Sequence, residues 1–137
     1  MPLEPNEIAS RIALASMMVG ACEGLAYARR AGVEREHALR ALEAALTLTS
    51  REASRVLEGD DEPELTVTRL LDEMSRALDS AEELGVEVPG LELARMLFQE
   101  VAEMGFADRG IQTLFRLWDD EDGGDDERGE LVQLRRR

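Results

Sequence analysis

The feature that most constrains the fold is a helix-stop pattern that occurs three times along the chain. In each copy a glycine follows the last turn of an apolar-periodic segment and precedes another apolar residue: Ala31-Gly32-Val33, Leu84-Gly85-Val86 and Met104-Gly105-Phe106. Glycine adopts the left-handed conformation that closes a helix, and the following apolar residue packs back on the final turn. The hydrophobic residues recur at helical spacing, with no convincing strand alternation. The sequence therefore predicts an all-α fold.

The same periodicity predicts a domain of five to six helices. The first helix runs from about residue 6 to residue 31, with Asn6 as its cap after Pro5. The others cover about residues 34–49, 66–84, 89–104 and 108–118, and residues 50–57 either continue the second helix or form a short one. The acidic segment from Glu58 to Pro63 is a loop. Residues 1–118 form the helical domain, and residues 119–137 form an acidic, disordered tail that is too charged to pack.

The first predicted helix is apolar on all sides from Ile12 to Cys22. Such a helix is buried on every side, and a chain this small can bury it by sharing it with a second copy. We therefore expect a long buried first helix and a homodimer whose interface contains Ile12, Met17, Met18, Ala21 and Leu25. Gly20 and Gly24 allow another helix to approach closely. The apolar stretch is shorter than the roughly 20 residues that span a bilayer, so no membrane association is expected.

The charge balance excludes several classes of function. The chain has 137 residues, of which 30 are acidic and 16 basic, giving a net charge of −14. Nucleic acids and anionic membranes select for basic patches, so neither is the expected partner. Every basic residue is arginine. The absence of lysine removes Schiff-base chemistry, a lysine acid or base, and any P-loop.

The chain also offers few metal ligands or nucleophiles. Cys22 and His37 are the only cysteine and the only histidine, so no intrachain disulfide forms and a zinc site would have to be mostly carboxylate. His37 would be the base of any Ser-His or Cys-His site, yet it lies early in a predicted surface helix. We expect no catalytic residue, metal or cofactor. The N-terminus has no basic region typical of a secretory signal, and a cytoplasmic location is expected.

The acidic tail matches a calcium loop only in part. Asp119, Glu121, Gly124 and Glu130 fall at positions one, three, six and twelve of an EF-hand loop. Glycine occupies the fifth position, where a ligand is needed, and the flanking helix pair is missing. A solvated acidic tail is the favoured interpretation.

Two segments of the chain carry a family resemblance. The segment Glu23-Gly-Leu-Ala-Tyr-Ala-Arg-Arg-Ala-Gly-Val33 resembles the "EGLALAxKAGL" stretch of the β-hydroxyacid dehydrogenases, the 3-hydroxyisobutyrate dehydrogenase family. The segment from Asp72 to Val86 is similar to that family's "KDLxLALEAAxELGV". The resemblance covers most of residues 7–118. It implies the all-helical C-terminal domain that 6-phosphogluconate dehydrogenases also have, through which subunits pair.

In that family the helical domain follows a Rossmann domain that binds NAD(P). The 137 residues contain no Gly-x-Gly-x-x-Gly after a strand, so we expect a copy of the helical domain that stands alone. The resemblance places the family's catalytic lysine at Glu7, its substrate-binding asparagine at Arg11 and its cofactor-side lysine at Asp72. A carboxylate cannot act as the cationic donor that stabilises a developing alkoxide. Glu7 and Arg11, four apart, are either a surface ion pair or, with Asp72, the lining of a remnant ligand-binding cleft.

The sequence thus leads to a non-catalytic homodimeric interaction domain as the first hypothesis. The alternative is a subunit of a split or divergent dehydrogenase, completed by a separate Rossmann-domain protein. A third hypothesis is a small-ligand binder with a pocket between the first helix and the helix that contains Asp72.

Overall fold

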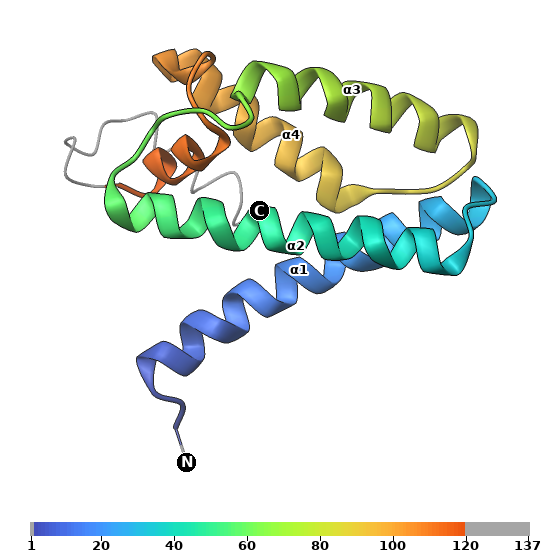
Figure 1. Cartoon of the computed structure of the whole chain (residues 1–137), viewed down its shortest axis with the longest axis horizontal. Helices are drawn as coiled ribbons and strands as arrows, with labels where there is room; N and C mark the ends of the chain where they lie inside the picture. The colour runs from blue at the N-terminus through green and yellow to red at the C-terminus, as the bar shows by residue number, and fades with distance from the viewer. Residues whose placement is uncertain (1, 120–137) are drawn as a thin grey trace.

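The computed structural model describes residues 2–119 and shows an all-helical chain (Figure 1). Its four α-helices are α1 (Pro5–Arg30), α2 (Arg35–Glu58), α3 (Val67–Glu83) and α4 (Pro89–Val101). A π-helical turn, η1 (Ala102–Phe106), and a 3-10 helix, η2 (Ile111–Leu117), follow them. The only β pairing among the described residues is an isolated bridge between Thr66 and Gly110. The predicted all-α class is confirmed.

Two of the three predicted helix stops, Gly32 and Gly85, lie just beyond the ends of α1 and α3. The third, Gly105, lies inside η1, where it breaks the helical conformation, and α4 itself ends at Val101 and not at the predicted residue 104. Gly32, Gly85 and Gly105 have φ angles of 78°, 71° and 104°, in the left-handed region that a β-carbon disfavours. The amide of Val86 donates back to the carbonyl of Ala81 at 2.9 Å. This bond belongs to the Schellman type of helix end, in which the residue after the glycine bonds back to the final turn.

Two further predicted element boundaries are corrected. The last helix is the 3-10 helix Ile111–Leu117 and not an α-helix over residues 108–118. The start of η2 is fixed by the loop before α3, because the amides of Gly110 and Ile111 donate to the carbonyls of Asp61 and Leu65 in that loop. At the other end of the chain, Pro5 is the first residue of α1, so the cap is Glu4 and not Asn6. Residues 50–57 simply continue α2.

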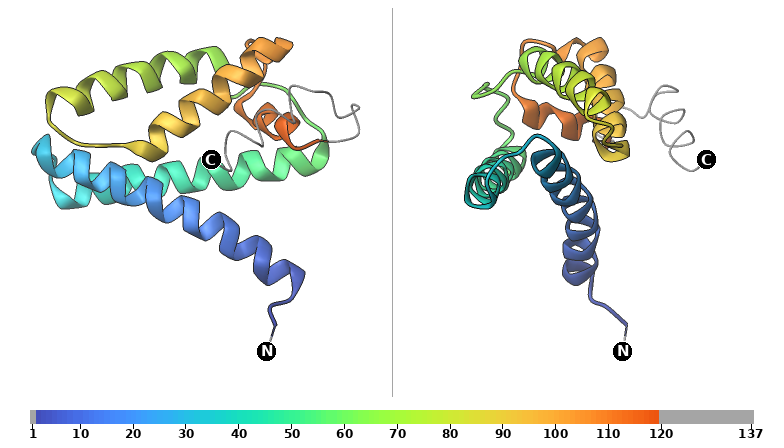
Figure 2. Two further views of the ribbon diagram at one scale, coloured as in Figure 1. Left: turned by 180° about the vertical axis from the view of Figure 1, so that it is seen from behind. Right: turned by 90° about the vertical axis from the view of Figure 1, so that its right-hand side faces the viewer.

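The core lies between the α3–α4 hairpin, α2 and η2. Helix η2 packs against both α2 and α4, and the hairpin covers the same side of α2 (Figures 1 and 2). The buried apolar residues come from α3, α4, η2 and the loop before α4: Val67, Met74, Ala81, Val88, Leu97, Val101 and Leu117. Helix α1 contributes none of them.

Helix α1 projects from this body. Its C-terminal half contacts α2 and α4, whereas its N-terminal half leads away from the other helices (Figures 1 and 2). Residues 2–20 are all exposed. The chain by itself therefore does not provide the burial expected for the first helix. Burial by a second copy stays a prediction.

By length and composition alone, α1 could also cross a membrane. The apolar stretch from Ile12 to Cys22 is short, but the 26-residue helix adds apolar residues such as Ile8 and Leu25 on both sides. A core helix of a soluble protein meets the same criterion. The expectation that the chain does not associate with a membrane therefore stays a prediction.

Candidate functional site

The three residues expected to line a remnant cleft are not brought together within one chain. Glu7 and Arg11 lie on the projecting half of α1, and Asp72 is an exposed residue in the N-terminal half of α3. The Glu7 carboxylate accepts the amide of Glu4 at 3.0 Å, which closes the start of α1. Asp72 forms an i,i+4 ion pair with Arg76 at 3.1 Å. No ion pair joins Glu7 to Arg11 in the described part of the chain.

The residues expected at a dimer interface lie along α1 but not on one side of it, because Ile12 and Ala21 are on opposite sides of the helix. Ile12 and Met18 are 67% and 53% exposed, values that are high for large apolar side chains in a folded chain. Met17 and Leu25 are also exposed, and Ala21 is half-buried. Because contiguous exposed apolar surface marks interaction sites in soluble proteins, we call these five residues the α1 apolar face.

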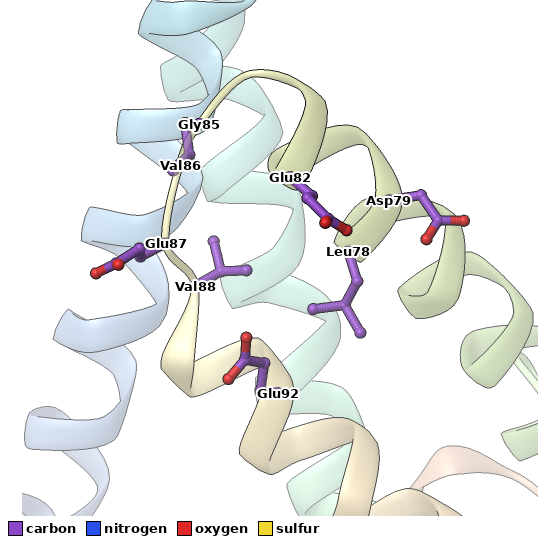
Figure 3. Close-up of a pocket in the computed structure, with 8 residues that line it drawn as sticks. All are labelled: Leu78, Asp79, Glu82, Gly85, Val86, Glu87, Val88 and Glu92. Carbon is purple, nitrogen blue, oxygen red and sulfur yellow. The ribbon is translucent and has the colours of Figure 1, made fainter.

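A cavity of about 480 Å³ lies where α3 ends and α4 begins (Figure 3). In Figure 3 the side chains of Leu78 and Val88 point toward a common space, with the carboxylates of Glu82 and Glu92 beside them. The remaining lining residues are Asp79, Gly85, Val86 and Glu87. Four carboxylates and no basic side chain line the cavity, so its charge opposes the phosphates of a nucleotide cofactor. None of the three predicted ligand-binding residues lines it.

The most specific geometry of the chain is the junction between α1 and the α3–α4 hairpin. Both carboxylate oxygens of Glu23 accept backbone amides at the start of α4, from Gly90 at 2.5 Å and from Leu91 at 3.0 Å. One turn further along α1, the hydroxyl of Tyr27 bonds that of Ser80 at 2.6 Å. The Nη1 of Arg30 donates to the carbonyl of Leu84 at 2.9 Å, at the end of α3.

We call the contacts of Glu23, Tyr27 and Arg30 the α1 clasp. These residues are spaced three and four apart, so they lie on one side of α1. Sequence reasoning did not assign them this role. The available signal was Pro89-Gly90 at the start of a helix whose cap position is held by Val88, which has no hydrogen-bonding side chain.

A second polar cluster joins α2 to η2. Glu52 and Gln112 are 5% and 6% exposed, and Gln112 Nε2 donates to the carbonyls of Asp60 and Glu62 at 2.7 and 2.9 Å. Arg116 pairs with Asp61 at 2.8 Å. These contacts fix the acidic loop after α2 against η2. The cluster has the character of a packing feature.

The candidates for metal and thiol chemistry within residues 2–119 are the acidic, histidine and cysteine side chains. No group of three or more histidine, cysteine or acidic side chains is arranged to hold a metal ion there. Cys22 is a free, exposed thiol on α1, although its apolar sequence surroundings predict a buried one. The residues of the calcium-loop comparison beyond Asp119 lie outside the described residues, as does most of the predicted tail.

Comparison with known proteins identifies relatives among oxidoreductases. YkwC of Bacillus subtilis, an uncharacterized oxidoreductase, is 36% identical over 116 residues, which make up 82% of this chain and 40% of YkwC. A probable mitochondrial 3-hydroxyisobutyrate dehydrogenase-like protein of Arabidopsis thaliana is 31% identical over 111 residues, 79% of this chain and 33% of that protein. The chain thus spans well under half the length of the curated relatives it matches.

Solved structures show the same fold at low sequence identity. An imine reductase from a Pseudomonas species superposes with a TM-score of 0.70 at 18% identity, over 82% of this chain and 41% of the reductase. The imine reductase BcSIRED of Bacillus cereus superposes with a TM-score of 0.66 at 17% identity, over the same shares of the two chains. These likenesses support the helical architecture.

The family match covers most of the chain. Residues 8–118 match the family described as "NAD-binding of NADP-dependent 3-hydroxyisobutyrate dehydrogenase". This range agrees closely with the residues 7–118 over which the sequence resembles the β-hydroxyacid dehydrogenases. The chain belongs to this family of helical domains from 3-hydroxyisobutyrate dehydrogenase-like proteins.

Proposed function

We propose that this chain is a non-catalytic helical domain that forms a homodimer through the α1 apolar face. One observation carries the proposal. Helix α1 has no buried residue in the single chain, although its middle is apolar on all sides. Exposing that surface to water is unfavourable by roughly 25 cal/mol for each Å². A second copy of α1 supplies apolar surface of the same kind.

The residues at the family's catalytic positions support a role without hydride transfer. Glu7 stands where the resemblance places the catalytic lysine, and its carboxylate is engaged by the start of its own helix. Asp72 stands where the cofactor-side lysine is expected and pairs with Arg76. Neither side chain can donate a hydrogen bond from a cationic group, as stabilisation of a developing alkoxide requires.

The experiment that tests the proposal is a mass measurement in solution together with cofactor titration. Sedimentation equilibrium of the whole chain is expected to give the mass of a dimer. Titration with NADH and NADPH, followed by nicotinamide fluorescence, is expected to give no saturable binding. A monomer at all accessible concentrations contradicts the dimer, and tight binding of either nucleotide by this chain alone contradicts the non-catalytic role.

The proposal includes a cytoplasmic protein rather than a membrane one. Although α1 is long and apolar enough to cross a bilayer, its C-terminal half carries the half-buried Glu23 and Tyr27, which bond to α4 and α3. Insertion of α1 into a membrane would break these bonds. The chain is expected to purify in the soluble fraction without detergent, and a requirement for detergent contradicts this part of the proposal.

A second candidate is a subunit of a split or divergent dehydrogenase that a Rossmann-domain protein completes. The observation that favours it is the length of the relatives, because the match covers only 40% of YkwC. In this case the α1 apolar face packs against the nucleotide-binding partner, and the chain alone is a monomer. Mixing the chain with the unmatched portion of YkwC tests this candidate, which requires a stable complex with dehydrogenase activity that neither part has alone.

A further inference from the structure

We infer that the Glu23 side chain on α1 caps the start of helix α4 and thereby fixes the direction in which α1 projects. We call this role the latch, and we call the exposed residues 5–20 the free half of α1. The inference concerns the single chain and does not depend on what α1 contacts.

The start of α4 lacks a cap from its own sequence. The first amides of a helix have no partner within the helix, and polar side chains at the cap position commonly satisfy them. Here Val88 holds the cap position and Pro89 has no amide hydrogen. The two remaining first-turn amides, of Gly90 and Leu91, are those that the Glu23 carboxylate accepts. The negative charge also lies at the positive end of the helix dipole.

Gly90 makes this contact possible. A β-carbon at position 90 would lie 2.9 Å from Glu23 Oε2 and 2.9 Å from Val19 Cγ1. Both distances are inside van der Waals contact, so any side chain at position 90 requires the Glu23 carboxylate and the Val19 side chain to shift. By contrast, a β-carbon at Gly20 or Gly24 would meet nothing within 4 Å.

Among the clasp residues, Glu23 is placed to have the largest effect on the direction of the free half of α1. Residues 2–20 are all exposed, and only Ala21, Glu23, Tyr27 and Ala28 of α1 are half-buried. Of the clasp residues, Glu23 lies nearest to the free half. Without its bonds, the hydrogen bonds from α1 to the α3–α4 hairpin are those of Tyr27 and Arg30 in its final turn. The 22 residues before Tyr27 in the helix then lie beyond the last of these bonds.

The first test measures amide exchange at Gly90 and Leu91. Glu23→Gln keeps the size of the side chain but replaces one of its two acceptors with an NH₂ group, so at least one of the two amides is expected to exchange about tenfold faster or more. Gly90→Ala is expected to accelerate exchange at Leu91 in the same way while it keeps the charge of Glu23. Ser80→Ala removes only the Tyr27 contact, and Gly24→Ala alters an uncrowded glycine, so both serve as controls without this local effect.

The second test measures the direction of α1. Spin labels at Ser10→Cys and Glu43→Cys, in a Cys22→Ser and Met18→Asp background, report the distance from the free half of α1 to α2. The Met18 change disfavours pairing through α1, and the mass of the labelled sample is measured so that only monomer is compared. Glu23→Gln is expected to broaden the distance distribution.

A rescue variant distinguishes the capping of α4 by Glu23 from the effect of Glu23 on the direction of α1. Val88→Thr, added to Glu23→Gln, gives α4 a cap of its own. It is expected to restore slow exchange at Gly90 and Leu91 and to leave the label distances broad. Unchanged exchange in Glu23→Gln overturns the capping role. An unchanged distance distribution, or one that Val88→Thr narrows again, overturns the latch.

Discussion

Replacing Met18 with aspartate tests the self-association of α1 most directly. In the single chain this side chain is 53% exposed, so the substitution removes little packing within a monomer. Full burial of a methionine side chain is worth about 1.5–3 kcal/mol, and a symmetric pair buries the exposed half of two copies. The loss of apolar burial alone is therefore about 1.5–3 kcal/mol per dimer.

The new carboxylate destabilises the dimer further, and by more than the lost burial does. Placing an unpaired charge in a closed apolar seam costs several kcal/mol, and each chain of the pair contributes one. Since about 1.4 kcal/mol corresponds to a factor of ten in the dissociation constant, the Met18→Asp dimer is expected to dissociate at least a thousandfold more readily. Sedimentation velocity over a wide concentration range measures this change.

A matched control comes from α2. Leu39 is 54% exposed, so Leu39→Asp adds the same charge to a helix at an equally exposed apolar position. It is expected to keep the mass of the dimer. If Met18→Asp stays soluble with the dimer mass of the unmodified chain, α1 does not form the interface and the inference from its exposed surface is refuted.

Three further changes have defined outcomes. Glu7→Ala removes the acceptor of the Glu4 amide and is expected to speed hydrogen exchange at that amide severalfold. The melting temperature is expected to stay unchanged because this turn lies outside the core. A large fall in melting temperature contradicts this. Gly85→Ala places a β-carbon on a residue with φ 71° and is expected to lower the free energy of unfolding by about 1–2 kcal/mol. Gly24→Ala, in contrast, is expected to raise the unfolding free energy of a monomeric chain by up to about 1 kcal/mol. Calorimetry that shows equal effects of the two variants refutes this difference. Truncation after Asp119 is expected to leave the melting temperature nearly unchanged, since the acidic composition of the removed segment predicts no packing. A loss of more than about 1 kcal/mol in unfolding free energy contradicts this.

The features that the sequence predicts well are local ones. A glycine after an apolar turn determines where a helix ends, and the left-handed φ expected at Gly32, Gly85 and Gly105 is found at all three, although η1 carries Gly105 beyond the end of α4. The apolar stripe of α3, with Met74 and Ala81 in the core, follows from its spacing. The late start of η2 was not predictable, because backbone bonds from Gly110 and Ile111 to a distant loop determine it.

The α1 clasp was not predicted because its hydrogen bonds join residues that are more than 50 positions apart in the sequence. Glu23 resembles any glutamate on a helix, and only the fold places its carboxylate at the start of α4. Glu52 likewise occupies a helix rich in charged residues but is buried, and it pairs with Arg55, which also bonds the carbonyl of Glu62 in the loop that follows. Glu7, Arg11 and Asp72 were expected to form a site because of the family resemblance. A resemblance in sequence does not show whether one chain brings these residues together, and here Glu7 and Arg11 lie on α1 whereas Asp72 lies on α3.

The α4 cap has a consequence for how this protein reaches its native state. Gly90 and Leu91 find their acceptor 67 and 68 residues upstream, so the opening turn of α4 cannot be completed until a loop of that size has closed. Loop closure of this length is entropically costly, which places the event late in folding. A fragment that starts after α1 would carry a frayed α4, so the smallest transplantable unit of this domain must include the first helix.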